Sequence, residues 1–219
     1  MAATPALAGE WRSRGFRNVV LWPRGVDTGL FHPRAAELAV DLGLPRPIFL
    51  CVGRVAVEKN LEAFLDLDLP GTKVIVGDGP ARAMLARKYP KAVFPGSRQG
   101  EELAKIYAAA DVFVFPSKTD TFGLVLLEAL ASGLPVAAFP VTGPRDVIGA
   151  APVGALNDDL RAACLSAMTI SPQACREFAA GHSWEASARA FVDNITDIRS
   201  ADRKGDAVPF AEHHPRFVA

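Results

Sequence analysis

The sequence lacks three features, and each absence excludes a class of protein. Lys plus Arg and Asp plus Glu both number 24, so there is no net charge and no basic field of the kind that nucleic-acid binders carry. No window approaches the roughly 18 consecutive apolar residues of a membrane span. The N-terminus lacks the basic and apolar regions of a secretory signal. We expect a cytoplasmic protein that binds no nucleic acid and is not integral to a membrane; peripheral membrane association stays open.

Metal-binding and disulfide patterns are missing as well. Cys51, Cys164 and Cys175 have the spacing of neither a disulfide framework nor a metal motif, and Cys51 lies in an apolar run where a small buried side chain is expected. The adjacent His213 and His214 point in different directions on any regular element, so we interpret them as part of an exposed tail. The sequence therefore indicates a reducing compartment and no metal site.

What the sequence does contain is a repeated alternation of short apolar strands and helices. This pattern favours an α/β fold, with a parallel sheet covered by helices on both faces and ligands at the carboxyl ends of the strands. The predicted strands are 18–22, 48–52, 73–76, 92–94, 112–115 and 135–139. The predicted helices are 5–14, 60–67, 81–88, 101–109, 122–131, 144–148, 160–168, 172–180 and 184–198.

Residues 113–135 concentrate the features that favour chemistry. An apolar strand ends at Pro116, and after a short polar loop Asp120 or Thr121 can cap a helix, because a side-chain oxygen there can accept from free first-turn amides. Such amides also suit a phosphate. Glu128 stands alone on an otherwise apolar helix and needs a partner, since an unpaired buried carboxylate is destabilising. The segment thus combines an anion site with two acids eight positions apart.

A second group of candidate residues follows the first core strand. Gly53 and Arg54 end that strand, and Lys59 comes five residues after Arg54, so both cations can face one anion. Arginine suits a bidentate phosphate contact, and lysine acts as a point charge. The alternative is that Arg54 pairs with Glu58 while Lys59 is solvated. Because the segment around Asp120 is also present, we favour the phosphate interpretation.

Two common nucleotide motifs do not fit. Residues 76–80 begin like the Gly-x-Gly-x-x-Gly dinucleotide fingerprint, but Arg82 occupies the third glycine position and Pro80 stands where the backbone must approach a pyrophosphate. We interpret this stretch as a tight turn into a helix. The sequence also has no Gly-x-x-x-x-Gly-Lys loop. These departures count against a Rossmann-like oxidoreductase and against an ATPase.

The stretch from Asp120 to Glu128 resembles the donor-site signature of retaining group 1 (GT4) glycosyltransferases with the GT-B fold: an acid, seven residues and a glutamate, with Phe-Gly just after the acid. The family more often has Glu first, and the Asp variant is similar to mannosyltransferase-like branches. Residues 53–59 resemble the family's Gly-Arg…Glu-Lys pattern, and 23–33 its crossover between two domains. Residues 142–146 stand where the family has Gly-Gly-x-x-Glu, with Asp for Glu.

The resemblance implies a role for the residues that bind the donor's phosphates. Arg54 and Lys59 would contact the diphosphate and stabilise it as it leaves. Backbone amides near Phe122, Gly123 and Leu124 would face the distal phosphate and the sugar, and glycine would let the backbone approach closely. The family's reaction needs neither a divalent metal nor a resident cofactor.

The resemblance likewise assigns the two acids. Asp120 would hold sugar hydroxyls and take part in catalysis, and Glu128 would hold the ribose hydroxyls, since a carboxylate accepts two such hydrogen bonds. The residues themselves leave alternatives open: a helix cap for Asp120, and an ion pair of Glu128 with Arg54 or Arg145. Arg98 is a candidate contact to the base or a phosphate, with a solvated surface position as the alternative.

The resemblance covers about residues 18–198 and predicts the organisation of the chain. Residues 1–33 would be the end of an N-terminal domain with the connector, 34–199 the Rossmann-like donor-binding domain, the donor-binding half of a GT-B fold, and 200–219 a tail. We expect a transferase that uses a GDP- or UDP-sugar, possessing an exposed cleft face that dimerises or pairs with an acceptor domain, and inactive without that domain. The alternative is a non-catalytic nucleotide-sugar-binding module.

Overall fold

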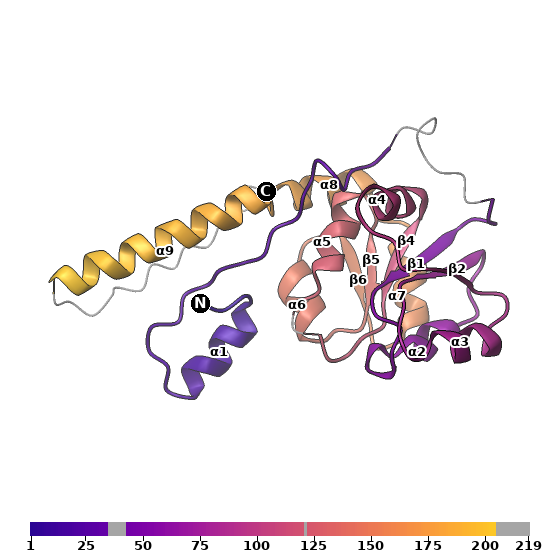
Figure 1. Cartoon of the computed structure of the whole chain (residues 1–219), viewed down its shortest axis with the longest axis horizontal. Helices are drawn as coiled ribbons and strands as arrows, with labels where there is room; N and C mark the ends of the chain where they lie inside the picture. The colour runs from indigo at the N-terminus through magenta and orange to yellow at the C-terminus, as the bar shows by residue number, and fades with distance from the viewer. Residues whose placement is uncertain (35–42, 121, 205–219) are drawn as a thin grey trace.

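The structure is built on a parallel sheet of six strands in the order β3-β2-β1-β4-β5-β6. The sheet and its flanking helices lie on the right of Figure 1. The computed structural model describes residues 1–34, 43–120 and 122–204. The strands are β1 Ile48–Val52, β2 Thr72–Val76, β3 Val93–Gly96, β4 Val112–Phe115, β5 Val136–Ala138 and β6 Gly154–Leu156. The helices are α1 Pro5–Ser13, the 3-10 helix η1 Val57–Lys59, α2 Leu61–Leu65, α3 Arg82–Lys88, α4 Gly100–Ala109, α5 Leu124–Ala131, α6 Thr142–Ile148, α7 Leu160–Ala167, α8 Pro172–Ala180 and α9 Trp184–Lys204.

Alternate residues of the central strands pack into two separate cores. Ile48 and Leu50 of β1 belong to a cluster with α4, α5 and α8, whereas Phe49 and Cys51 belong to a cluster with α2, α3 and α7. The same alternation holds along β4. A strand whose neighbouring side chains point to opposite faces can bury both sets only when helices cover both faces. The predicted Rossmann-like fold with helices on both faces is therefore confirmed.

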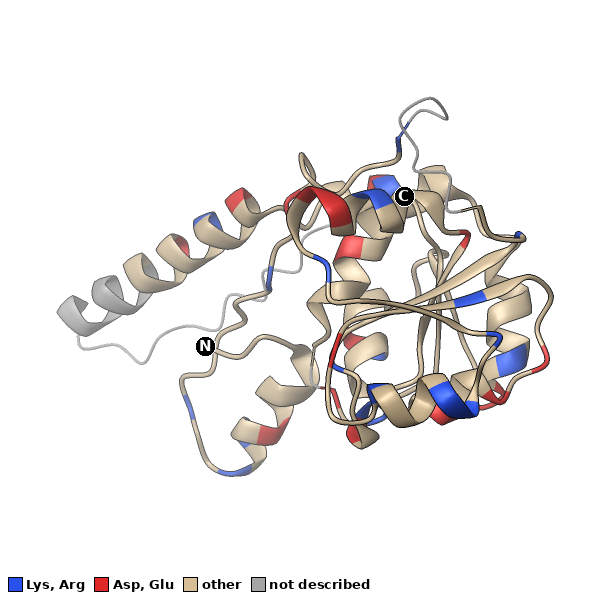
Figure 2. Ribbon diagram, turned by 45° about the vertical axis from the view of Figure 1, so that its right-hand side comes forward, with Lys and Arg blue, Asp and Glu red and all other residues tan. Residues whose placement is uncertain are grey.

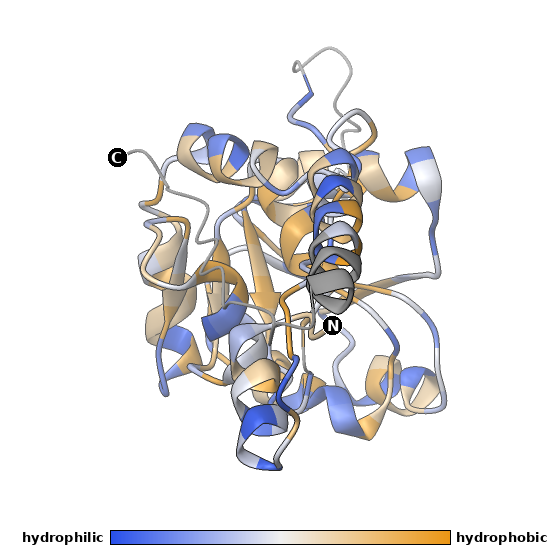
Figure 3. Ribbon diagram, turned by 90° about the vertical axis from the view of Figure 1, so that its left-hand side faces the viewer, coloured by the Kyte–Doolittle hydropathy of each residue, from blue (hydrophilic) through white to orange (hydrophobic). Residues whose placement is uncertain are grey.

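The N-terminal segment and α9 form an outer layer beside the sheet domain. In Figure 1, α9 extends away from the sheet and α1 lies on the same side. The Trp22 ring lies 4.9 Å from that of Phe191, and Asn194 donates to the Leu21 carbonyl. α9 nevertheless carries apolar residues in contact with solvent, visible as orange stretches in Figure 3; Val192 is 59% exposed. The N-terminal segment thus packs against α9, but the contacts between the two leave several apolar side chains of α9 exposed.

Several expected elements differ from the structure. Residues 18–22 do not form a strand and contribute only a single bridge, between Leu21 and Ala2, so that prediction is wrong. The edge strand β6 was not predicted. α5 begins at Leu124 with Gly123 as its N-cap and no side-chain cap, so the capping role for Asp120 is also wrong, and Thr121 lies outside the described residues.

The C-terminal region is described only in part. α9 continues to Lys204, and the remainder of the predicted tail, with His213 and His214, lies outside the described residues. Among the helices that the structure describes, none has the length and apolar character needed to cross a bilayer. Acidic and basic residues are interspersed over the helices (Figure 2), in keeping with the equal numbers of the two charges. The division into domains stays a prediction.

Candidate functional site

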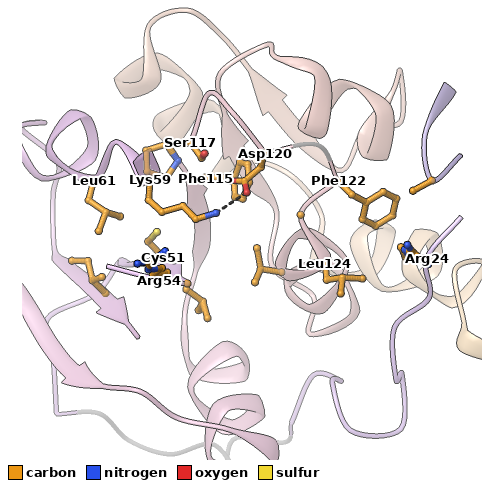
Figure 4. A pocket seen from close by; sticks show the side chains of 17 residues that line it. Arg24, Cys51, Arg54, Lys59, Leu61, Phe115, Ser117, Asp120, Phe122 and Leu124 are labelled. Carbon is orange, nitrogen blue, oxygen red and sulfur yellow. Dashed lines mark hydrogen bonds and ion pairs between the residues drawn. The ribbon is translucent and has the colours of Figure 1, made fainter. Parts of the chain in front are cut away.

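A cavity of about 420 Å³ opens at the carboxyl ends of β1 and β4, the edge of the sheet where the strand pattern predicts a ligand. Three parts of the chain line most of it (Figure 4). They are the end of β1 with the loop that follows, the loop after β4, and the first residues of α5. The residues of these parts that line the cavity are Cys51, Val52, Gly53, Arg54 and Lys59, then Phe115, Pro116, Ser117 and Asp120, then Phe122, Gly123, Leu124 and Val125.

Backbone packing fixes the loop that carries the two predicted cations. Gly77 approaches β1 so closely that a Cβ there would lie 1.8 Å from the Gly53 carbonyl oxygen. Asn60 adopts a left-handed conformation, with φ of 53°, and its side-chain amide donates to the Pro116 carbonyl at 3.0 Å. This bond joins the loop after β1 to the loop after β4, and it places Lys59 between them.

Lys59 and Asp120 form an ion pair across the cavity wall. Their Nζ and Oδ1 atoms lie 2.6 Å apart, and the two side chains are only 28% and 23% exposed (Figure 4). Partial burial weakens the screening by water that reduces surface ion pairs. The second oxygen, Oδ2 of Asp120, is fully buried and has no hydrogen-bond partner among the described residues. The carboxylate therefore orients Lys59 and keeps one acceptor unused.

Arg54 is held much less firmly. Its guanidinium lies 3.5 Å from Glu58, and both side chains are more than half exposed. Such a surface pair contributes little, about 0–1 kcal/mol. The alternative considered from the sequence thus holds for Arg54, which does pair with Glu58, but it is wrong for Lys59. Because the pair is weak, Arg54 can exchange Glu58 for an anion in the cavity.

The start of α5 presents backbone amides to the same cavity. Gly123 caps the helix with φ of 78°, a left-handed conformation that glycine adopts without strain, and no side chain caps the first turn. The neighbouring Leu124 and Val125 line the cavity. α6 presses on this loop, since a Cβ on Gly143 would lie 2.7 Å from the Asp120 carbonyl oxygen. The uncapped end of the helix therefore offers free amides that can bind an anion.

Glu128 lies one turn further along α5 and is not a lining residue of the cavity. Its Oε2 accepts a hydrogen bond of 2.9 Å from the hydroxyl of Tyr107, and among the described residues the alternative ion pair with Arg54 or Arg145 is not present. Burial raises the pKa of Glu128, and the Tyr107 hydrogen bond partly offsets this effect. Burial also raises the pKa of Tyr107, so its hydroxyl stays protonated and acts as the donor.

Arg98 stands apart from the other predicted residues. It is exposed, its Nη1 donates to the carbonyl of its neighbour Ser97, and its Nε lies 3.8 Å from Glu102. It does not line the cavity. The structure therefore places it where the alternative interpretation did, on the solvated surface.

Among the lining residues that were not predicted for this site, three carry a polar or ionisable side chain. Arg24 reaches the cavity from the connector and lies over the Trp22 ring, 4.7 Å from its centroid. Ser117 is 2% exposed, and its hydroxyl has no partner in the described part of the chain. Cys51 was interpreted as a buried apolar residue; burial raises the pKa of its thiol to about 12, so it stays neutral. Arg24 meets Phe122 and Leu124, about a hundred positions later in the chain, only through the fold, and no sequence pattern near Arg24 predicts this proximity.

The arrangement suits a phosphorylated ligand. Arg24, Arg54 and Lys59 face the cavity together with the amides at the start of α5, and both kinds of group attract anions. Among the residues described, no cluster of three His, Cys, Asp or Glu side chains has the geometry to hold a metal ion.

Comparisons with known proteins agree with this geometry. Residues 46–169 match the family described as glycosyl transferases group 1. The chain is 44% identical over 138 residues to sulfoquinovosyl transferase SQD2 of Arabidopsis thaliana, covering 58% of this chain and 27% of that protein. It is 45% identical over 153 residues to a GDP-mannose-dependent alpha-mannosyltransferase of Mycobacterium tuberculosis, covering 68% and 40% respectively.

Solved structures give the same fold. The sucrose-phosphate synthase of Thermosynechococcus elongatus superimposes with a TM-score of 0.74 at 27% identity, covering 91% of this chain and 58% of that one. The chain spans between 27% and 40% of the length of the curated relatives that it matches. Because the family model matches more than half of the residues, this chain belongs to the group 1 glycosyltransferases.

Proposed function

We propose that this chain is the donor-binding part of a retaining glycosyltransferase that moves a hexose from a nucleoside diphosphate sugar to an acceptor hydroxyl. One observation carries the proposal: the Lys59–Asp120 pair and the uncapped start of α5 meet in one cavity at the carboxyl ends of β1 and β4. The pair supplies a cation beside an unused carboxylate oxygen, so a phosphate and a sugar hydroxyl can be bound side by side.

The chemistry follows from where charge develops. The bond between the anomeric carbon and the distal phosphate oxygen breaks, and its electron pair stays on that oxygen. Arg54, Lys59 and the first amides of α5 would face the oxygen as it becomes more negative, so they stabilise the transition state more than the bound donor. The acceptor hydroxyl forms the new bond to the anomeric carbon on the face from which the diphosphate leaves, and its proton passes to the departing phosphate oxygen. Because cations and amides of the chain neutralise the leaving group, the proposal includes no metal and no resident cofactor.

The acids have separate tasks in this proposal. The Asp120 carboxylate, whose Oδ2 has no partner in the described chain, accepts from a hydroxyl of the sugar. Glu128 accepts from the ribose hydroxyls with the oxygen that Tyr107 does not hold. The matched alpha-mannosyltransferase is GDP-mannose-dependent, and this favours GDP-mannose as the donor over a UDP-sugar.

The acceptor would be bound by a partner domain, as in two-domain enzymes of this fold. The outer layer supports this, because four residues of α9, Trp184, Phe191, Val192 and Ile195, and the neighbouring Leu21 all expose more than a third of their surface. Exposed apolar residues gathered on one element mark a surface that another protein covers. We also infer a cytoplasmic location, supported by three cysteines that are all buried and unpaired.

The test is a thermal-shift and calorimetric series with GDP, UDP and ADP, each with and without its common sugars. A ligand that binds only the folded state stabilises it by about 2.7 kcal/mol at a hundred times its Kd. We expect a shift selective for guanine nucleotides, and no sugar transfer by the isolated chain. The absence of a shift with all three nucleotides would contradict the proposal. Binding without transfer after an acceptor domain is supplied would indicate a non-catalytic module.

A further inference from the structure

Among the described residues, the only hydrogen bond to the Glu128 carboxylate comes from a buried tyrosine of another helix. Tyr107 lies on α4, is fully buried, and donates its hydroxyl proton to Oε2 at 2.9 Å. Burying a tyrosine hydroxyl is favourable only when it finds a partner. The two residues are 21 positions apart and come from different elements, so this bond is a feature of the fold and not of either helix alone.

Two other aromatic rings hold the Tyr107 ring in place. Phe31 of the connector meets it edge-on, with ring centroids 5.5 Å apart and planes at 88°. Phe113 of β4 lies 5.7 Å away on a tilted plane. Close-packed rings in these arrangements leave little freedom of rotation. The hydroxyl is therefore fixed relative to both the sheet and the connector.

The other oxygen of Glu128 remains open. Oε1 accepts no hydrogen bond from the described residues, yet it is not among the unpartnered atoms that are closed off from solvent. Glu128 is three and four positions after Val125 and Leu124, which line the cavity, so the three residues share one face of α5. Helical side chains lean toward the N-terminus of their helix, and this directs Glu128 toward the cavity end of α5.

We propose that Tyr107 is a positioning residue of the donor site: it fixes Oε2 of Glu128 so that Oε1 is presented to the ribose hydroxyls of the donor. This inference rests on the proposed function. Rotation about the last bond of a glutamate is broad and roughly two-fold, so an unheld carboxylate spends part of its time turned away from a ligand. A hydroxyl held at one oxygen removes that freedom before the ligand arrives, and pre-organisation of this kind lowers the cost of binding.

The experiment compares Tyr107→Phe with the unchanged chain in calorimetric titrations with GDP and with 2′,3′-dideoxy-GDP. The variant removes one oxygen and keeps the ring, so the packing with Phe31 and Phe113 survives, and its melting temperature verifies this. We expect the Kd for GDP to rise about three- to tenfold and the Kd for the dideoxy nucleotide to stay unchanged, because that nucleotide has no hydroxyls for Oε1 to accept from. A merely structural role would weaken both ligands equally and would overturn the inference.

Tyr89→Phe is the matched control. Its hydroxyl also donates to a carboxylate, Oδ1 of Asp66 at 2.6 Å, but Tyr89 is not a lining residue of the cavity. Its loss should leave both affinities unchanged. Should Tyr107→Phe fail to fold, Phe31→Leu loosens the ring without removing the hydroxyl, and a loss confined to GDP would again support the inference. An equal loss with both ligands, or no loss, would count against it.

Glu128→Gln separates this inference from the proposed function. If Glu128→Gln weakens GDP while Tyr107→Phe does not, the ribose role stands and the positioning role of Tyr107 is wrong. If neither variant affects GDP, the ribose role fails and the positioning role falls with it. If the unchanged chain binds no nucleotide at all, the proposed function itself is contradicted. When both variants are combined, the loss should equal that of Glu128→Gln alone, because Tyr107 acts through Glu128.

Discussion

The two acids at either end of the segment 120–128 belong to the same loop and helix, yet their surroundings differ. Asp120 sits at the cavity wall with a cation, Lys59, at 2.6 Å and a second oxygen that has no partner in the described chain. Glu128 lies one turn after the start of α5 and has a neutral partner, the Tyr107 hydroxyl. Burial raises the pKa of Glu128. One carboxylate is stabilised by a charge, and the other only by a hydrogen bond.

This difference teaches that an acid's partner, more than its motif, decides what it can do. A carboxylate paired with Lys59 fixes the position of a cation for an incoming phosphate. A carboxylate held by a tyrosine keeps a full negative charge to share with neutral donors such as hydroxyls, at the cost of a harder ionisation.

Replacing Lys59 by Met removes the cation from the Asp120 side. A hydrogen bond to a charged group contributes about 1.5–3 kcal/mol, so the Kd for GDP should rise by about 10- to 100-fold. Lys118→Met is the control, since Lys118 is exposed, lies 4.4 Å from the centroid of the Phe139 ring and does not line the cavity. Calorimetry measures both. Equal losses in the two variants would show that general charge, and not this ion pair, governs binding.

Gly143→Ala disturbs the loop of Asp120 without touching its side chain. The new Cβ would lie 2.7 Å from the Asp120 carbonyl oxygen, so the loop or α6 must move. Overpacking of this kind lowers the free energy of unfolding by about 1–3 kcal/mol, and nucleotide affinity should fall with it. Urea denaturation and calorimetry measure the two effects. Gly9→Ala in α1, where nothing lies within 4 Å, should destabilise nothing; a Gly143→Ala chain that behaves likewise would contradict the close packing.

The raised pKa of Glu128 predicts the sign of one pH effect. Above its ordinary value of 4.5 the folded chain holds the Glu128 proton more tightly than the unfolded chain. Stability therefore falls as pH rises from 4.5 through the raised folded-state value. In Glu128→Gln this fall is absent, so the stability difference between the two chains should change in that window. Urea denaturation from about pH 4 to about pH 8 measures it, and a difference that is constant with pH would contradict the burial of the charge.

Arg98→Gln should have the smallest effect. The side chain is exposed, faces Glu102 and lies outside the cavity, and surface changes of this kind stay within about 0.5 kcal/mol. The Kd for GDP should therefore change by less than about threefold. A tenfold loss, measured in the same titrations, would show that the donor site extends to the loop before α4.

The fold was largely predictable because its signal is local. The central strands are short apolar runs between helices with helical spacing, and both patterns are visible over a few residues. β6, Gly154–Leu156, escaped prediction because it has only three residues, all half-buried at the edge of the sheet. Residues 18–22 are apolar enough for a strand, but they lie against α9 and have no neighbouring strand to pair with beyond one bridge.

The sequence predicted some of the residues that line the cavity, but it missed Arg24, included Arg98, which lies outside, and did not show how the residues pair. Motif spacing predicted that Arg54, Lys59 and Asp120 would meet in one cavity, because the parallel strands that they follow end at the same edge of the sheet. It did not show that Lys59 pairs with Asp120 across 61 residues, or that Tyr107 holds Glu128. Those contacts depend on how the loops and helices pack in three dimensions.

A crystal structure of the chain grown with GDP tests the central claim most directly. We predict the diphosphate in the cavity, within hydrogen-bonding distance of Lys59 and the first amides of α5, with the ribose beside Oε1 of Glu128. GDP bound elsewhere on the chain, or an empty cavity at concentrations that saturate binding in solution, would contradict the account.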